Sequence, residues 1–305
     1  MTIDTFITLL IQELNANRQF GTSHIYKSTQ ASFQKYLSCR AVGFEELNQT
    51  MICQYELWLS DRGLSLNTIS TYMRTLRAIY NKAIQAGIAP DVSFLFKKVY
   101  TGVESKVKRS ISPVAVERLI HADRQQLSKK HAEACDLFAL QFYLRGMPFV
   151  DLLQLKRSNL YGNLLCYHRR KTGRRIVVKL EVEAQKILNR YLSTSVGSPY
   201  IFPLYRDAQL KNANHYQAYQ SSLRKYNDAL FRLTLQLKLG VKLTSYTPRH
   251  TWATTAYHSK QPLGLISNAL GHSSITVTEH YLRPFSDQEL HLLNRRVIRE
   301  VLTRN

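Results

Sequence analysis

Hydrophobic residues recur every three or four positions along the first hundred residues, which predicts a helical unit. The clearest run opens the chain, with apolar side chains at Ile3, Phe6, Ile7, Leu10, Ile11 and Leu14. Similar spacing predicts helices over 23–38 and 49–60, and a fourth that Asn67 caps and Gly87 ends. We therefore expect a helical domain over residues 1–100.

The next stretch, TGVESKVKRSIS, is polar, basic and poor in large apolar residues, so residues 101–111 are predicted to be an interdomain linker. Ser112 followed by Pro113 is typical of a helix N-cap and first helical position. The second domain is predicted to cover residues 112–305 and to be mainly helical. Its one β element is a hairpin, Leu164–Lys171 with Arg174–Leu180, around Thr172-Gly173.

Charge narrows the list of partners. The chain has 42 Lys and Arg against 21 Asp and Glu, a formal net charge of +21. Such an excess favours a polyanionic partner, either nucleic acid or an anionic membrane surface. No segment approaches the ~20 apolar residues of a membrane span, and the basic residues are spread along the whole chain. We therefore expect nucleic acid as the partner and no membrane.

The remaining composition fits a protein of a reducing cytoplasm. The N-terminal segment carries Asp4 and Glu13 and lacks the basic n-region of a signal peptide. The four cysteines are widely spaced and form no CxxC pair, which argues against disulfides and against a zinc site.

Three groups of basic residues are candidates for DNA contact. Arg74 and Arg77 lie one turn apart on the fourth predicted helix, where a solvated surface is the alternative. The linker contributes Lys106, Lys108 and Arg109. The hairpin turn, for which an ordinary solvated turn is the alternative, contributes Arg169, Arg170, Lys171, Arg174 and Arg175.

The candidate chemistry lies in residues 246–285, YTPRHTWATTAYHSKQPLGLISNALGHSSITVTEHYLRPF. Thr247 is predicted to be an N-cap and Pro248 the first helical residue, which places Arg249 in the first turn of a helix. The free amides and the dipole at a helix N-terminus favour anions. An arginine there is therefore suited to bind a phosphate.

A histidine and a tyrosine follow at short distances. Gly271 is predicted to end a short helix and to leave His272 at its end. Thr276 and Glu279 match a capping box for another helix, which would carry Tyr281. The separations from Arg249 to His272 and from His272 to Tyr281 are compatible with convergence on one phosphate.

This ordered set resembles the tyrosine recombinases, in which an RHTxA segment, an LGH segment and a tyrosine nine residues further on form the C-terminal half of the active site. The helical N-terminal unit, the linker and the KTG hairpin match the family layout. The resemblance implies a mainly α fold, with a SAM-like core-binding domain and an α-rich catalytic domain containing a small antiparallel sheet. It further implies a C-shaped clamp on DNA, four protomers in a synapse, and accessory DNA-bending proteins as further partners.

The resemblance also implies roles. Tyr281 would be the nucleophile that forms a 3′-phosphotyrosyl bond, and Arg249 would neutralise the non-bridging phosphate oxygens. His272 would form hydrogen bonds or handle protons, and Lys171 would protonate the leaving 5′ oxygen. No metal and no cofactor would be needed.

Two departures from the family pattern concern catalysis. Tyr246 takes the place of the first histidine of H-x-x-R. In G-[LM]-R-x-x-[DE] the family's first arginine is replaced, because the segment here is GMPFVD and Pro148 occupies that position. This variant resembles the recombinases of Bacteroides-type mobile elements and DNA invertases. Arg145 is our candidate for the replacement, with Arg169 and Arg170 as alternatives.

Three other activities remain open at this point: a type IB topoisomerase, a DNA-binding protein without catalysis, and a metal-dependent nuclease. The tail has apolar residues at helical spacing, Leu290, Leu293, Val297 and Ile298. We expect it to form a helix that docks on a neighbouring protomer, with packing on its own domain as the alternative.

Overall fold

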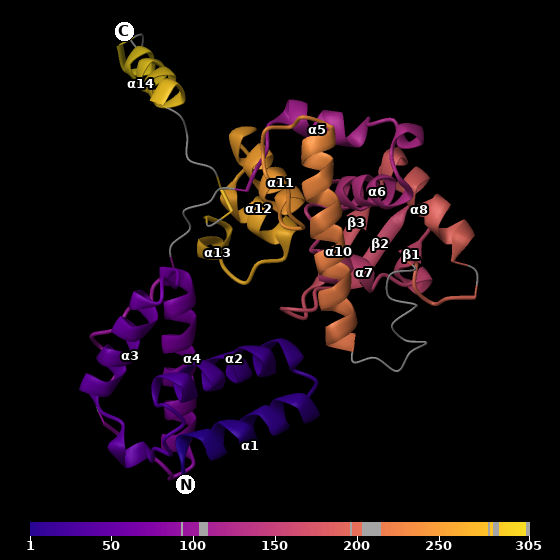
Figure 1. Ribbon diagram of the computed structural model, residues 1–305. Helices are drawn as coiled ribbons and strands as arrows, with labels where there is room; N and C mark the ends of the chain where they lie inside the picture. The colour runs from indigo at the N-terminus through magenta and orange to yellow at the C-terminus, as the bar shows by residue number, and fades with distance from the viewer. Residues whose placement is uncertain are drawn as a thin grey trace. The chain divides into compact units, whose positions relative to one another are not determined.

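A computed structural model describes residues 1–92, 94–103, 109–195, 197–202, 215–279, 281–282 and 287–302. The chain divides into two compact units, Met1–Lys106 and Val107–Asn305. Figure 1 labels their helices and strands. Lys106 and Lys108, two of the candidate DNA contacts, lie outside the described residues.

The first unit is helical, as its hydrophobic periodicity predicts. Its elements are α1 (Ile3–Ala16), α2 (Phe20–Tyr36), the 3-10 helix η1 (Phe44–Glu46), α3 (Gln49–Asp61) and α4 (Leu66–Gln85). Their apolar faces meet in one core, in which Ile52, Tyr55, Leu59 and Met73 are completely buried. Arg74 and Arg77 lie on α4 with their side chains exposed.

The predicted cap of α4 is wrong by two residues. Ser65 is the N-cap, and its Oγ accepts a hydrogen bond from Thr68 N at 3.3 Å, while Asn67 lies inside the first turn. Both residue types favour N-caps, so composition alone did not separate them. The C-terminal end agrees with the prediction, because Ala86 is the C-cap and Gly87 follows it with φ of +69°.

The second unit is mainly helical and contains a small sheet. Its helices are α5 (Pro113–Ile120), η2 (Arg124–Gln126), α6 (Lys129–Tyr143), α7 (Phe149–Leu153), η3 (Arg157–Asn159), α8 (Val182–Thr194), α10 (His215–Gln236), α11 (Thr247–His258), α12 (Leu263–Leu270), α13 (Ile275–Glu279) and α14 (Asp287–Leu302). Helix α6 contacts α5, α8, α10 and α11 and is therefore central to the unit (Figure 1). Its segment from Ala134 to Gln141 is buried.

The three strands β1 (Leu160–Tyr161), β2 (Leu164–His168) and β3 (Arg175–Lys179) form an antiparallel sheet in the order β1-β2-β3. Cys166 pairs with Val177, and the ladder closes at His168 with Arg175. The predicted hairpin is present, but β2 ends three residues earlier than expected. Two backbone bonds close the turn instead, from Arg169 N to Arg174 O and from Gly173 N to Arg169 O.

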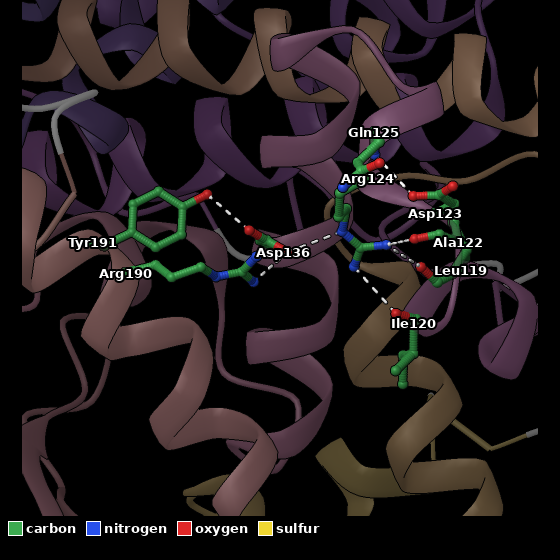
Figure 2. Close-up of polar contacts among 9 residues, drawn as sticks. All are labelled: Leu119, Ile120, Ala122, Asp123, Arg124, Gln125, Asp136, Arg190 and Tyr191. Atoms are coloured by element: carbon green, nitrogen blue, oxygen red, sulfur yellow. Dashed lines mark hydrogen bonds and ion pairs between the residues drawn. The ribbon is translucent and has the colours of Figure 1, made fainter.

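A buried acidic residue, Asp136 on α6, joins three neighbouring elements (Figure 2). Its Oδ1 forms ion pairs with Arg124 Nε of η2 and Arg190 Nη2 of α8, both at 3.1 Å. Arg124 also donates to the carbonyls of Leu119, Ile120 and Ala122 at the end of α5. The network therefore satisfies the free carbonyls of one helix and fastens that helix to α6.

None of the helices in the described ranges is long and apolar enough to cross a membrane. The predicted tail helix is present as α14, and Ile298 on it is exposed. The side chains of Leu290, Leu293 and Val297 lie outside the described part of the chain, so docking of the tail stays a prediction.

Candidate active site

Arg249 lies in the first turn of α11, as predicted, although the helix begins one residue earlier than expected. Tyr246 is the N-cap and Thr247 the first helical residue. The guanidinium is buried, and it donates from Nη1 to Gly146 O at 2.9 Å and from Nη2 to Leu270 O at 2.6 Å. Burial lowers the pKa of Arg249, and the charge of Arg169 lowers it further.

His272 is brought to Arg249 by the end of α12. Gly271 is the C-cap, with φ of +67° in the left-handed region, and it turns the chain back toward α11. A Cβ there would lie 2.9 Å from Ile176 Cδ1, so only glycine fits without displacement. The Nε2 atom of His272 lies 2.8 Å from Arg249 Nη2, and Nδ1 lies 2.8 Å from Thr278 Oγ1.

The protonation state of His272 follows from these partners. Arginine has no acceptor, so Nε2 must accept from Arg249, and a neutral ring then carries its proton on Nδ1. Burial lowers the pKa of His272 to about 3, helped by the charges of Arg249, Arg169 and Lys171. In the DNA-free protein His272 is therefore a neutral hydrogen-bonding group at physiological pH.

Tyr281 lies beside both residues, but, contrary to the prediction, it is not on a helix. Helix α13 spans only Ile275–Glu279, Thr276 lies inside it rather than capping it, and Tyr281 follows its end. The aromatic ring of Tyr281 lies 5.4 Å from the Arg249 guanidinium carbon and 5.0 Å from the His272 ring. The predicted convergence of these three groups is present in the structure.

The backbone of Tyr281 is held from both sides. Its N–H donates to Thr278 O at 2.9 Å, and its carbonyl accepts from Thr254 Oγ1 at 3.2 Å. His250 Nδ1 also lies 3.2 Å from this carbonyl, and the His250 ring lies 4.5 Å from the Tyr281 ring. Helix α11 therefore fixes the tyrosine as well as presenting Arg249.

A second buried arginine shares the site. Arg169, at the end of β2, was expected at an exposed turn, but it is only 6% exposed. Its Nη1 donates to Leu270 O at 2.6 Å, the same carbonyl that Arg249 binds. Its Nε forms an ion pair with Asp151 Oδ2 at 3.0 Å.

Asp151, the acidic residue of GMPFVD, is itself buried and also accepts from Arg170 N at 3.0 Å. Burial raises the pKa of Asp151, and the hydrogen bond from Arg170 N and the charge of Arg169 oppose that rise. This carboxylate therefore needs both partners.

The rest of the hairpin turn faces outward. Arg170, Lys171 and Arg175 are exposed. Arg174 is exposed as well, yet it donates from Nη1 to His272 O at 2.9 Å and from Nη2 to Asn268 Oδ1 at 2.7 Å. The turn is therefore fastened to the segment that carries His272, and Lys171 remains at the surface beside the site.

Tyr246 and Arg145 are placed differently from one another. Tyr246 is half exposed, Arg109 lies 5.8 Å from its ring, and it borders a cavity of about 20 Å³ with Pro148 and Arg249. Burial raises the pKa of Tyr246, so the phenol stays protonated near neutral pH and is a poor base there. Arg145, with φ of +57°, forms no hydrogen bond or ion pair with the described residues, but its charge, like those of Arg169 and Arg249, opposes the rise that burial causes in the pKa of Tyr167.

Sequence reasoning missed two supporting residues. Gly146 approaches α11 so closely that a Cβ would lie 2.7 Å from Arg249 Cα, and its φ of +65° also favours glycine. Thr278 is completely buried and contacts His272. The glycine of GMPFVD was a usable signal for Gly146, whereas nothing in the sequence distinguished Thr278 from the neighbouring threonine. Among the described residues no group of three or more His, Cys, Asp and Glu side chains is arranged to hold a metal ion.

Comparison with known proteins identifies the family of the chain. A model of the phage integrase SAM-like domain matches residues 3–99, and a model of the phage integrase family matches residues 109–288, more than half of the chain. The chain belongs to the phage integrase family. The predicted resemblance to the tyrosine recombinases and the mainly helical fold with a small antiparallel sheet are thereby confirmed, whereas the resemblance to the Bacteroides-type branch stays a prediction.

Relatives of this integrase are tyrosine recombinases. Tyrosine recombinase XerD of Oceanobacillus iheyensis is 23% identical over 274 residues, covering 86% of each chain. The Tn1549 transposon integrase in complex with transposon right end DNA has a TM-score of 0.64 at 16% identity, covering 98% of this chain and 100% of that one. A lambda integrase dimer bound to a COC′ core site has a TM-score of 0.66 at 17% identity, covering 92% and 95%.

Proposed function

We propose that this integrase is a site-specific recombinase that cuts and rejoins double-stranded DNA with Tyr281 as its nucleophile. The observation that carries the proposal is the cluster in which Arg249 contacts His272 at 2.8 Å with the Tyr281 ring beside both. Tyr281 Oη bonds to phosphorus as the bond from phosphorus to the 5′ oxygen breaks. The phenol loses its proton, the 5′ oxygen gains one, and the covalent bond conserves the energy for rejoining.

Arg249 and Arg169 neutralise the non-bridging oxygens in this proposal. Three of the five donors of Arg249 are used within the chain, and its buried Nε has no partner among the described residues. A phosphate oxygen would satisfy that donor. Arg169 shares Leu270 O with Arg249, and we therefore assign to it, rather than to Arg145, the role of the arginine that Pro148 replaces.

Lys171 and His272 have complementary roles. Lys171 is exposed at the turn beside the site and is available to protonate the leaving 5′ oxygen. His272, neutral and buried, accepts from Arg249 through Nε2 and so orients that guanidinium toward the phosphate, rather than donating a proton itself. Tyr246, half exposed at the edge of the same site, is placed to contact the DNA backbone.

Partners follow from the proposed reaction. The Tn1549 integrase and the lambda integrase have solved structures bound to DNA, and in the latter the integrase is a dimer. The structure of XerH recombinase contains its difH substrate. We propose double-stranded DNA and further copies of this chain, four in a synapse, as the partners, with Arg74, Arg77, Arg109, Arg170 and Arg175 along the DNA. Because the substrate is DNA, the protein would act in the cytoplasm.

Covalent trapping tests the proposal. Duplexes that bind the wild-type protein are selected from random sequences and nicked at successive positions. When cleavage occurs close to a nick, the short fragment that carries the released 5′ hydroxyl diffuses away and cannot be rejoined. Wild type should form an adduct that survives denaturation, and mass spectrometry should place a 3′-linked nucleotide on Tyr281. Tyr281→Phe should bind with unchanged affinity and form no adduct, while Tyr161→Phe, at an exposed tyrosine of β1, should behave as wild type.

The other outcomes identify the rivals. DNA binding without an adduct in wild type would leave a DNA-binding protein without catalysis. Relaxation of supercoiled DNA without dependence on sequence would favour a topoisomerase. Cleavage that EDTA abolishes would favour a nuclease.

A further inference from the structure

Thr278 touches both His272 and the nucleophile's segment through two different atoms. Its side-chain Oγ1 lies 2.8 Å from His272 Nδ1, and its backbone carbonyl accepts from Tyr281 N at 2.9 Å. The residue has no exposed surface. It therefore belongs to the buried part of the site and presents no surface to a substrate.

The direction of the hydrogen bond to His272 is fixed by chemistry. Because Arg249 Nη2 occupies Nε2 as a donor, Nε2 must present its lone pair. The neutral ring then has its proton on Nδ1, and Thr278 Oγ1 accepts it. The opposite tautomer would place two donors against each other at the Arg249 contact.

We propose that Thr278 is a positioning residue, which holds His272 as the Nδ1–H tautomer with Nε2 toward Arg249 and couples that ring to the turn carrying Tyr281. A histidine with one ring nitrogen fixed by a hydrogen bond has a defined role for the other nitrogen. The link to Tyr281 means that the histidine and the nucleophile move as one unit. The kinetic consequence of this inference rests on the proposed function. The assignment of the His272 tautomer does not depend on that function.

The charged groups around the His272 ring increase the importance of the Thr278 hydroxyl as the acceptor for Nδ1–H. Arg249 faces Nε2 from α11, Arg169 and Lys171 come from the hairpin turn, and Arg174 donates to the backbone carbonyl of His272. All are cations, so a second N–H at Nε2 is disfavoured. No acidic side chain contacts the ring among the described residues, and Thr278 is the only acceptor that meets Nδ1 there.

Two variants separate the hydroxyl from the backbone contact. Thr278→Val keeps the branched shape and the carbonyl that holds Tyr281, but removes the acceptor. Thr278→Ser keeps the hydroxyl and is the rescue control. Imidazole ¹⁵N–¹H correlation spectra of the DNA-free protein report which ring nitrogen is protonated, and His272→Asn identifies the His272 signals by their loss.

Wild type and Thr278→Ser should show the Nδ1–H pattern. In Thr278→Val the buried Nδ1–H has no acceptor, so the ring should turn away from Arg249 and lose this pattern. Adduct formation at saturating nicked duplex should slow by about tenfold to 100-fold in Thr278→Val, as for other residues that orient a histidine, with DNA affinity unchanged. An Nε2–H pattern in wild type would overturn the proposal, as would unchanged spectra in Thr278→Val or equal slowing in Thr278→Ser. If wild type forms no adduct, the proposed function fails, and the spectra still decide the role of Thr278.

Discussion

Leu270 O accepts hydrogen bonds from two arginines, and this single atom explains much of the site. Two guanidinium groups held by one carbonyl repel each other strongly in a buried environment. Asp151 offsets one charge. Among the described residues no other carboxylate pairs with either arginine, so the arrangement favours an incoming anion such as a phosphate before DNA is considered.

Arg169 is therefore expected to affect catalysis more than binding. Arg169→Lys keeps a charge near Asp151 but cannot pair with it and reach Leu270 O in the same fork geometry. We predict that adduct formation slows by about 10²- to 10³-fold, the cost of removing a preorganised donor, with DNA affinity changed far less. The measurement is single-turnover trapping at saturating DNA.

The matched controls are Arg145→Ala and Arg170→Ala. The first should trap nearly as fast as wild type, and the second should weaken DNA binding without a large change in the trapping rate, because Arg170 is exposed. A slow Arg145→Ala together with a normal Arg169→Lys would return the role to Arg145.

His272 also predicts a dependence of stability on pH. Its pKa is about 3 in the folded chain and 6.5 in the unfolded one, so between these values the unfolded chain binds a proton that the folded chain does not. The free energy of unfolding should therefore fall as the pH is lowered through this window, by up to about 1.4 kcal/mol per pH unit from this group.

His272→Asn removes that contribution, so its unfolding free energy should fall less steeply between pH 6 and pH 4. Urea unfolding followed by Trp252, in a chain with Trp58→Phe, measures the second unit alone. The exposed His291→Asn should keep the wild-type slope. Parallel slopes for His272→Asn and wild type would contradict the account.

Asp136 shows at the scale of helices how the site is supported. It connects η2 and α8 to α6 (Figure 2). Helix α6 in turn contacts α11, which carries Arg249. Asp136→Asn leaves Arg124 without its anion at a position only 22% exposed. We predict a loss of about 3 kcal/mol in unfolding free energy, as for a broken buried ion pair, measured by urea unfolding.

The control is Asp228→Asn on α10, whose partner Arg232 lies one turn away with both side chains exposed. That change should cost less than about 0.5 kcal/mol. Equal losses in the two variants would mean that the network around Asp136 contributes no more than a surface pair.

Elements were predictable where one periodic pattern dominated. The four N-terminal helices and the hairpin follow their apolar spacing. The ends of the elements were not predictable, because several residues that favour N-caps lie close together, as Ser65 and Asn67 do in α4. Tyr281 was placed on a helix because Thr276 and Glu279 match a capping box, but α13 already ends at Glu279.

The candidate site was predictable as a set of residues that lie together and not as a set of contacts. Arg249, His272 and Tyr281 converge as their spacing indicated. Arg169 could not be assigned from the sequence, because five basic residues surround Thr172-Gly173 and only the fold distinguishes the one that turns inward. The contact that distinguishes it joins residues 169 and 270, which are far apart in the chain.

At the scale of the whole molecule, the net charge of +21 and the family match both direct attention to DNA. The central claim is that one phosphate is held by Arg249 and Arg169 beside Tyr281, with His272 orienting Arg249. The most direct test is a structure of Tyr281→Phe bound to a selected duplex. We predict one backbone phosphate within about 3 Å of donors from both arginines, with His272 adjacent and the substituted aromatic ring facing the phosphorus. A bound duplex whose phosphates all lie beyond contact with Arg249 and Arg169 would contradict the claim.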